Sequence, residues 1–376
     1  MKTINGVYTS ADIYTTSDVD TAIDDYAIHQ IQMLCDNETA KGSKIRVMPD
    51  VHPGKVGTIG LTMTITPKLM PNLINVDIGC GMTLAQIKGK TKEFQKLDVV
   101  IRDNIPSGFS TRKNVHHMAE SIDLTRLYCY KHIYEKKAFL SLGTLGGGNH
   151  FIELDMDEDK NVYLVVHSGS RHLGKEVTEY YLTEGQKELK NKDIIVPYEL
   201  TYLEGALLEH YLHDLEIVQE FAALNREIII AEILKGMKWK KMDTYSCIHN
   251  YVDFSHDTPI LRKGAISARK NEPVIIPINM RDGILLGTGL GNPDWNYSAP
   301  HGAGRIMKRE NVKESFTVSS FKTAMKGIYS SCISKDTLDE APFAYRNLES
   351  IKEAIVDTVA VEKIIKPIYN YKAGNN

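Results

Sequence analysis

Residues 206–237 contain the feature that constrains the fold most, a long segment with helical periodicity. Its apolar residues recur three or four positions apart, which places them on one face of a helix. The residues that define this face are Leu208, Leu212, Leu215, Ala222, Ile229 and Ile233. We therefore expect one long amphipathic helix whose apolar face packs against the rest of the fold.

Short apolar runs broken by Gly and Pro lie before and after this helix and are typical of β-strands. They are KIRVM (44–48), TIGLTMTI (58–65), LINVDIG (73–79), VYLVV (162–166), VIIPINM (274–280) and GILLGTG (283–289). We expect a shorter helix at 176–197 and a terminal helix at 347–361. Because helices and strands do not alternate regularly, the pattern favours an α+β fold over a doubly wound sheet. It predicts one compact catalytic domain over residues 1–376, with mixed β-sheets flanked by helices and a helical excursion at about 175–245.

Charge and cysteine content exclude several classes of protein. The chain has 45 Lys and Arg against 48 Asp and Glu, a net charge of −3, which excludes a polybasic protein that coats nucleic acid. Its five cysteines are widely spaced and form no CxxC pair, so we expect neither a disulfide framework nor a zinc ribbon. No signal peptide or apolar run of about 18 residues is present. We expect a cytoplasmic protein without a membrane partner.

A local basic groove remains compatible with this charge balance. Three stretches are rich in Lys or Arg, at 88–96, 235–241 and 305–309. Each could line a groove for RNA, and each could equally be a solvated face of the protein. The sequence does not decide between these two interpretations.

Residues that can bind metals occur in Gly-rich turns, most of them after strand-like runs. Asp77 and Cys80 follow LINV, His150 ends the string GGGNH, His167 follows VYLVV, and His249 follows YSCI. Isolated His and Cys residues are usually structural, and we interpret the remaining ones in that way. Five such residues at comparable turns predict a common cleft.

This set of ligands suits a borderline divalent metal such as Mn²⁺, Fe²⁺, Co²⁺ or Zn²⁺, because it mixes oxygen, nitrogen and sulfur. One thiolate can bridge two ions, and two neighbouring ions would serve phosphoryl chemistry. A further histidine, His301, lies beside Gly302, Ala303 and Gly304 and could act as a nucleophile toward phosphorus.

At these residues the sequence resembles the RtcB family of RNA ligases. The similar strings follow the order of the family: MPDVHPG (48–54), NVDIGCG (75–81), LGGGNHFIE (145–153), VVHSGSR (165–171), HNYV (249–252), RKGAI (262–266) and SAPHGAGR (298–305). The similarity extends to about residue 372.

The resemblance implies an RtcB-like catalytic domain that joins RNA 3′-phosphate or 2′,3′-cyclic phosphate ends to 5′-hydroxyl ends. It implies GTP as co-substrate, two Mn²⁺ per chain, and His301 as the histidine that becomes guanylylated. The first metal is expected at Asp77, Cys80 and His150, and the second at Cys80, His167 and His249. Broken RNA and GTP are the expected partners, and an archease-type activator, used by some family members, is a candidate partner.

The resemblance also implies the GTP contacts. Glu153 is expected to accept hydrogen bonds from the N1–H and N2–H₂ edge of guanine, and Tyr345 to stack on the base. Asp50, Arg171 and Arg305 are expected to support the metal ligands or contact phosphate. The complete set of expected GTP contacts is Asn149, His150, Phe151, Ile152, Glu153, His249, Asn250, Pro277, Ile278, Asn279, Met280, Ile284, His301, Gly302, Ala303, Gly304 and Lys372.

Three departures from the family pattern concern the phosphate side of this site. The usual PGSM string is Pro277-Ile278-Asn279-Met280 here, Ile284 offers no hydroxyl, and His172 replaces a glycine. These changes suggest the hypothesis of a divergent branch that repairs cleaved RNA rather than splicing tRNA.

Two other functions remain open from the sequence. A binuclear cyclic-phosphate phosphodiesterase would use the same metal ligands without a covalent role for His301. A noncatalytic RNA- or nucleotide-binding module would have to keep a costly buried cluster of thiolate and carboxylate groups unused.

Overall fold

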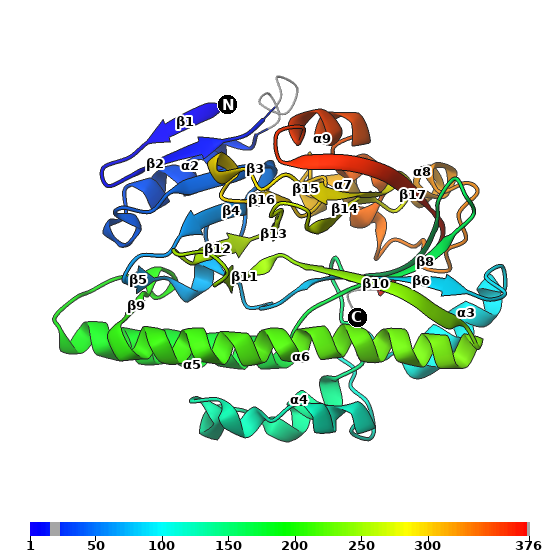
Figure 1. Ribbon diagram of the computed structural model, residues 1–376, viewed down its shortest axis with the longest axis horizontal. Coiled ribbons are helices and arrows are strands. Elements are labelled where there is room, and N and C mark those ends of the chain that lie inside the picture. The colour runs from blue at the N-terminus through cyan, green and yellow to red at the C-terminus, as the bar shows by residue number, and fades with distance from the viewer. Residues whose placement is uncertain (16–22, 374–376) are drawn as a thin grey trace.

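The computed structural model describes residues 1–15 and 23–373, which form two main β-sheets with long helices along one side (Figure 1). The first sheet has six strands in the order β1-β2-β3-β4-β12-β11, and only the β2–β3 pair is parallel. Its strands are β1 (Lys2–Asn5), β2 (Ser10–Ile13), β3 (Ile45–His52), β4 (Ile59–Thr64), β11 (Asn250–Asp253) and β12 (Ile260–Lys263).

The second sheet has seven strands in the order β10-β6-β8-β7-β17-β15-β14, and all neighbours are antiparallel. Its strands are β6 (Gly81–Lys88), β7 (Phe151–Met156), β8 (Val162–Ser168), β10 (Lys240–Ile248), β14 (Pro273–Asn279), β15 (Gly283–Gly289) and β17 (Val359–Lys372). This sheet curls until its two outer strands approach, since the Cys247 thiol lies 3.5 Å from the carbonyl oxygen of Pro273.

The remaining elements connect and cover these sheets. Two short pairs are β5 (Lys68–Leu69) with β9 (Leu203–Glu204) and β13 (Ala265–Ser267) with β16 (Ser298–Pro300). The α-helices are α2 (Asp25–Cys35), α3 (Phe94–Asn104), α4 (Glu135–Ser141), α5 (Arg171–Asn191), α6 (Gly205–Met237), α7 (Arg309–Ser315), α8 (Val318–Ala324) and α9 (Leu348–Ala354). Short 3₁₀ turns are η1 (Glu38–Ala40), η2 (Pro71–Leu73), η3 (His117–Ser121), η4 (Leu124–Arg126), η5 (Tyr130–His132), η6 (Tyr198–Leu200), η7 (Pro293–Trp295), η8 (Leu338–Glu340) and η9 (Pro342–Ala344).

Helix α6 joins the cores of the two sheets. Tyr211 and Phe221 belong to a hydrophobic cluster that includes strand residues of the first sheet. Ile229 and Ile233, further along the helix, belong to a cluster built on the second sheet. The helix is therefore apolar over much of its circumference, because it is covered by different elements along its length.

The α+β class is confirmed, as is the long helix predicted at 206–237, which is α6. The runs at 44–48, 58–65, 162–166, 274–280 and 283–289 are strands β3, β4, β8, β14 and β15. Each of these runs is rich in β-branched or large apolar residues, and all except 162–166 have Gly or Pro in or next to them, the pattern on which the prediction was based.

Three local predictions were wrong. The run at 73–79 is not a strand but a turn, in which Asn75 and Gly79 have φ of 88° and 67°. The helix predicted at 176–197 begins at Arg171 and ends at Asn191, where Asp193 turns the chain with a φ of 57°. The terminal helix predicted at 347–361 stops at Ala354, and the chain continues as β17.

The chain continues as strand β17 because two neighbouring strands supply hydrogen-bond partners for its successive parts. It pairs with β15 through residues 359–365 and with β7 through residues 366–372. These pairings outweigh the weak local preference for helix, as tertiary context commonly does. None of the helices in the described ranges is long and apolar enough to cross a membrane.

We predict that Phe221→Ala lowers the free energy of unfolding by about 3–5 kcal/mol, because the ring is fully buried in the middle of α6. Urea denaturation followed by circular dichroism measures this change. Ile195→Ala is the control, since Ile195 is 96% exposed and its truncation should change stability by no more than about 0.5 kcal/mol. Equal effects of the two substitutions would show that α6 does not join the cores.

Candidate active site

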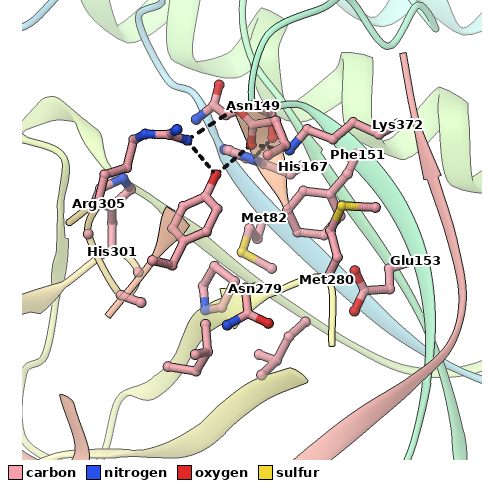
Figure 2. Close-up of a pocket in the computed structure, with 18 of the residues that line it drawn as sticks. Met82, Asn149, Phe151, Glu153, His167, Asn279, Met280, His301, Arg305 and Lys372 are labelled. Atoms are coloured by element: carbon pink, nitrogen blue, oxygen red, sulfur yellow. Dashed lines mark hydrogen bonds and ion pairs between the residues drawn. The ribbon is translucent and has the colours of Figure 1, made fainter. Parts of the chain in front are cut away.

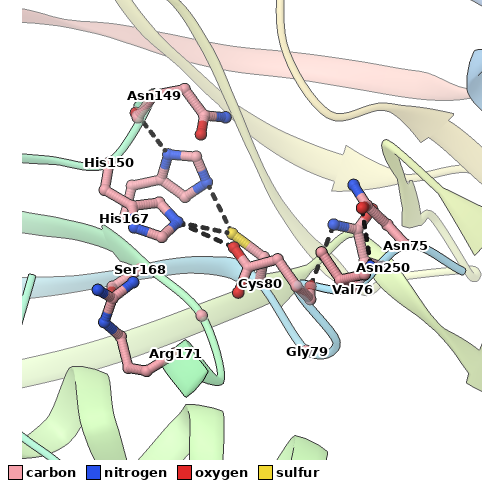
Figure 3. Close-up of polar contacts among 12 residues, drawn as sticks. Asn75, Val76, Gly79, Cys80, Asn149, His150, His167, Ser168, Arg171 and Asn250 are labelled. Atoms are coloured by element: carbon pink, nitrogen blue, oxygen red, sulfur yellow. Dashed lines mark hydrogen bonds and ion pairs between the residues drawn. The ribbon is translucent and has the colours of Figure 1, made fainter. Parts of the chain in front are cut away.

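Side chains from four separate parts of the chain lie around the sulfur of Cys80, and Figure 3 shows this sulfur with His150 and His167. The Nε2 atoms of His150 and His167 lie 3.3 and 3.4 Å from this sulfur. His150 precedes β7, His167 lies near the end of β8, and His249 joins β10 to β11. The five side chains form two groups that share Cys80, one with Asp77 and His150 and one with His167 and His249, and within each group the ligand atoms lie within 4.8 Å of one another.

Backbone carbonyls fix the orientation of two of these imidazoles. The Nδ1 of His150 lies 2.8 Å from the carbonyl oxygen of Leu145, and the Nδ1 of His167 lies 3.1 Å from that of Asn149. A carbonyl can only accept, so each Nδ1 carries the proton and each Nε2 presents a lone pair to the cluster. This is the arrangement in which proteins hold histidines that bind metals.

The resulting cluster contains more lone pairs than protons. The Nε2 of His150 faces Asp77 Oδ2 at 3.0 Å, and the Nε2 atoms of His167 and His249 face each other at 3.1 Å. Lone pairs at such distances repel unless a proton or a cation lies between them. The donor set of one carboxylate, one thiol and three imidazoles therefore fits a pair of borderline divalent metals.

Burial dominates the electrostatics of this cluster. It raises the pKa of the Cys80 thiol well above its usual range, and the Asp77 charge adds to this effect. It also lowers the pKa of His167 and His249 well below the usual range, keeping both imidazoles neutral. Burial opposes ionisation of Asp77, but its contact with His150 and the charge of Arg171 bring its pKa to about 2.

Helix α6 holds the turns that carry the ligands. The buried guanidinium of Arg226 donates to the carbonyl oxygens of Gly79 at 2.8 Å and Ser168 at 2.9 Å, which adjoin Cys80 and His167. The neighbouring Asn225 accepts from the amides of Gly143 and Thr144 and donates to the oxygen of Gly169. Two successive residues of one helix thus fix three turns relative to one another.

Arg226 also places a positive charge next to the cluster. The structure gives it no carboxylate partner among the described residues, and its hydrogen bonds go to neutral oxygens. Burial lowers its pKa to about 10, against the raising effect of Cys80 and Asp77. It therefore remains protonated at neutral pH and favours the ionised forms of both ligands.

Two glycines allow the close approach of these elements. A side chain at Gly79, which has a φ of 67°, would lie 3.0 Å from Ala222 Cβ and Gln219 Cα on α6. A side chain at Gly169 would lie 2.1 Å from Asp77 Oδ1. The metal-competent turns can therefore reach α6 and each other only because these positions lack Cβ atoms.

His301 lies beside the cluster and has its own carboxylate partner. Its Nδ1 is 2.6 Å from Oδ2 of the fully buried Asp50, and its ring centroid is 4.7 Å from that of His249. The carboxylate accepts the Nδ1 proton, so Nε2 has a free lone pair. The polarised imidazole is thus held in the tautomer that a nucleophile requires.

A cavity adjoins His301 (Figure 2). His301 and Arg305 lie on one side of it, and Phe151, Glu153 and Lys372 lie on the other. The cavity is lined by apolar side chains and a few charged ones, the combination found in sites for small molecules.

Two buried carboxylates, Glu340 and Glu153, line the cavity. Glu340 pairs with Lys372, Arg309 and Arg305. Burial opposes its ionisation, but these three charges lower its pKa to about 2. Glu153 instead accepts from the Asn370 amide at 2.5 Å, and burial raises its pKa to about 7.

The structure brings most of the predicted GTP contacts to this cavity. Those that line it are Asn149, Phe151, Glu153, His249, Pro277, Ile278, Asn279, Met280, Ile284, His301, Gly302, Ala303, Gly304 and Lys372. Tyr345 and Arg305 line it as well, but the Tyr345 hydroxyl is engaged by Glu340 and Arg305.

Three predicted contacts lie elsewhere. His150 faces the metal-competent cluster rather than the cavity. Ile152 points to the opposite face of β7 from Phe151 and Glu153, into the hydrophobic core, because side chains alternate along a strand. The side-chain amide of Asn250 donates to the backbone carbonyl oxygen of Asp77 and accepts from the backbone amide of Gly264.

Several lining residues were missed by the sequence analysis. They are His52, Met82, Gly283, Arg309, Glu340 and Asn370. Asn370 is two positions before Lys372 on β17, so a correct prediction of that strand would have placed both on one face. Glu340 lies in a short 3₁₀ turn and carries no sequence signal that distinguishes it.

Comparison with known proteins identifies the family. A family model described as tRNA-splicing ligase RtcB matches residues 39–373. The chain belongs to the RtcB family.

The relatives of this RtcB family member come from bacteria and archaea. The RNA-splicing ligase RtcB of Escherichia coli K12 is 32% identical over 356 residues, covering 84% of this chain and 87% of the relative. The tRNA-splicing ligases RtcB of Aeropyrum pernix and Methanococcus maripaludis are 26% and 25% identical, each with 85% of both chains covered. The suspected resemblance is confirmed, and these names do not favour the phosphodiesterase alternative.

We predict that Arg226→Met weakens the affinity for divalent metal about 10–100-fold, because it removes the hydrogen bonds and the charge that position Cys80 and His167. Titration with Co²⁺, followed by thiolate charge-transfer absorption, measures this loss without any turnover. Arg226→Lys should recover part of the affinity, and Arg102→Met, on an exposed ion pair, should leave it unchanged. An unchanged Co²⁺ affinity in Arg226→Met would refute this role.

Proposed function

We propose that this protein is an RNA ligase that joins RNA 3′-phosphate or 2′,3′-cyclic phosphate ends to 5′-hydroxyl ends, with GTP as co-substrate. The observation that carries the proposal is the position of His301. It stands between a five-ligand metal-competent cluster and a cavity, with its Nδ1 proton held by Asp50 at 2.6 Å. Membership of a family whose members are named as RNA- and tRNA-splicing ligases supports the same activity.

In the first step, we propose that His301 Nε2 attacks the α-phosphorus of GTP. A bond forms between nitrogen and phosphorus, and the bond from phosphorus to the pyrophosphate oxygen breaks. Asp50 stabilises the positive charge that develops on the imidazole, because its carboxylate lies on Nδ1. An oxygen of the RNA 3′-phosphate would then attack the histidine-bound GMP and break its bond to nitrogen, and the 5′-hydroxyl would displace GMP to seal the strand. A 2′,3′-cyclic end would first have to be opened by water to a 3′-phosphate.

We propose two Mn²⁺ ions at the cluster, one held by Asp77, Cys80 and His150 and one by Cys80, His167 and His249. When bound, such ions supply charge neutralisation at the phosphates and lower the pKa of an attacking hydroxyl. Two features of the chain support this arrangement. Carbonyl oxygens already orient the imidazoles of His150 and His167. Burial raises the pKa of the Cys80 thiol, and a bound cation would compensate the charge of its thiolate.

For guanine, we propose that Glu153 accepts hydrogen bonds from N1–H and N2–H₂ at the far end of the cavity. An adenine base presents no pair of donors there, so the carboxylate would select GTP over ATP. Asn370 orients Glu153, and the Glu340–Lys372 pair closes the same end.

The departures from the family pattern give this cavity an apolar wall. Ile278 and Ile284 are buried at its edge, and the amide of Asn279 is engaged by Asp282 at 2.8 Å. We propose that phosphate contacts come from the 301–305 loop rather than from this wall. Repair of cleaved RNA remains the hypothesis for the physiological substrate.

We further propose that residues 1–376 act as one ligase domain, with the 175–245 segment as a helical part that supports the metal turns. An archease-type protein remains a candidate activator.

We predict that incubation with Mn²⁺ and [α-³²P]GTP labels the protein covalently, with acid-labile label, and that His301→Ala abolishes the label. Asp50→Asn should reduce the rate of labelling about 10²–10⁴-fold, because the tautomer and charge of His301 are no longer supported. Denaturing gels measure both effects. Metal-loaded protein without label would favour the phosphodiesterase.

We also predict that GTP binds more tightly as pH rises from 6 to 8. Burial raises the pKa of Glu153 to about 7, and only its ionised form accepts both guanine hydrogen bonds. The ionised fraction therefore rises about tenfold over this range, and affinity should follow it. Calorimetry measures the effect, with Glu153→Gln as control, because that variant keeps the same phosphate and metal titrations without the carboxylate. The same pH dependence in both proteins would contradict the assignment.

A further inference from the structure

Two of the basic stretches of the sequence, about 140 residues apart, are neighbours in the structure. Lys240 pairs with Lys88 in the antiparallel ladder between β10 and β6. The Trp239 indole donates to the carbonyl oxygen of Lys90 at 3.1 Å, which ties the segment after β6 to the end of α6. Figure 1 shows the ends of β6 and β10 beside α3 and the last turns of α6.

These segments carry a group of exposed lysines, here called the lysine cluster. Its members are Lys88, Lys90, Lys92, Lys96, Lys235, Lys238, Lys240 and Lys241. Within the described part of the chain, Lys96 is the one member that pairs with a carboxylate, that of Glu93 at 3.5 Å. The only other acid between 88–96 and 235–243 is Asp243.

Some exposed lysines elsewhere in the chain have a carboxylate partner, as Lys187 and Lys192 do at 2.7 Å from a glutamate oxygen, and others, such as Lys131 and Lys136, have none among the described residues. What distinguishes the lysine cluster is its number of charges, because eight lysines gather at one end of the second sheet, where the β7–β8 turn adds the acids Glu158 and Asp159. This local excess of positive charge occurs although the chain as a whole carries a net charge of −3. Like charges gathered in this way repel one another, and a bound polyanion would remove the repulsion.

The lysine cluster is connected to the candidate active site by the strand pair itself. β6 begins at Gly81, next to Cys80, and ends at Lys88. β10 runs in the opposite direction, from Lys240 to Ile248, which precedes His249. At about 3.3 Å per residue, eight residues place the cluster roughly 25 Å from the metal-competent cluster.

The surface between these two ends is also suited to nucleic acid. Residues 240–246 of β10 are exposed, and Met242 and Tyr245 are 57% and 42% exposed. Beside the lysine cluster lies a surface hollow lined by Phe94 and Tyr329, whose ring centroids are 5.7 Å apart. Proteins that bind single-stranded RNA commonly combine lysines with aromatic rings on their binding surface.

We propose that the lysine cluster and the exposed face of β10 form an RNA-binding track, which holds the body of the substrate some 25 Å from the break. This inference rests on the proposed ligase function and adds to it a preference for RNA that extends several nucleotides from its broken end. Binding along the track is to phosphates and is independent of sequence.

The test neutralises three lysines of the track, in the variant Lys88→Gln, Lys240→Gln, Lys241→Gln. The control, Lys131→Gln, Lys136→Gln, Lys190→Gln, removes three exposed charges on η5, α4 and α5. Two single-stranded substrates are compared, one extending 4 nucleotides and one 20 nucleotides on each side of the break. Fluorescence anisotropy measures RNA affinity over a salt series, and single-turnover assays measure ligation.

For the long substrate, the track variant should bind at least about tenfold more weakly at low salt, and its salt slope should fall by about 2, at about 0.7 per lost phosphate contact. The short substrate and the covalent labelling with GTP should be unaffected, and the control should resemble the unmodified protein.

Equal weakening for both substrates, no weakening for either, or the same loss in the control would overturn the track. Binding of the lysine cluster to phosphatidylserine vesicles with no effect on RNA would likewise overturn it. A failure of the proposed function is distinguishable, because it would appear as absent labelling and absent ligation in the unmodified protein, while anisotropy would still report on the track.

Discussion

The candidate active site depends on the convergence of lone pairs at one buried sulfur. Cys80, Asp77 and three imidazoles meet there with more acceptor atoms than protons. Carbonyl oxygens hold two of the histidines, His150 and His167, in the tautomer that presents Nε2 to the cluster without a proton. Such a cluster is unfavourable in an apolar interior unless cations occupy it. Every nearby element therefore has to hold the ligands at short distances against their mutual repulsion.

Helix α6 holds the ligands in place against this repulsion. It lies in the cores of both sheets, so its position is fixed along its length by packing rather than by the cluster. Asn225 and Arg226 transmit that position to the turns at 79–80, 143–144 and 168–169 through hydrogen bonds. The same helix ends at the lysine cluster, so one element relates the proposed chemistry to the proposed RNA track.

The sequence was informative where a local pattern also determined the tertiary role. Periodicity identified α6, and the polar turns identified Asp77, Cys80, His150, His167, His249 and His301 as residues that belong together, which the structure brings to one place. It failed where the decisive contacts are distant. β17 is a strand because β7 and β15 flank it, and Glu340 lies at the cavity because Lys372 and Arg309 pair with it. Neither the strand nor the cavity position can be predicted from the residues that are adjacent in the sequence.

The placement of β17 also bears on how the protein is made. This strand is the last element of the described chain to be synthesised, yet it occupies an interior position in the seven-stranded sheet, between β7 and β15. Until it emerges from the ribosome, the β10-β6-β8-β7 half and the β15-β14 half have no strand between them. The cavity then also lacks Asn370 and Lys372. A nascent chain could thus assemble all five metal-competent residues while the cavity beside them is still incomplete, so that the proposed binding of a nucleotide would await completion of the sheet.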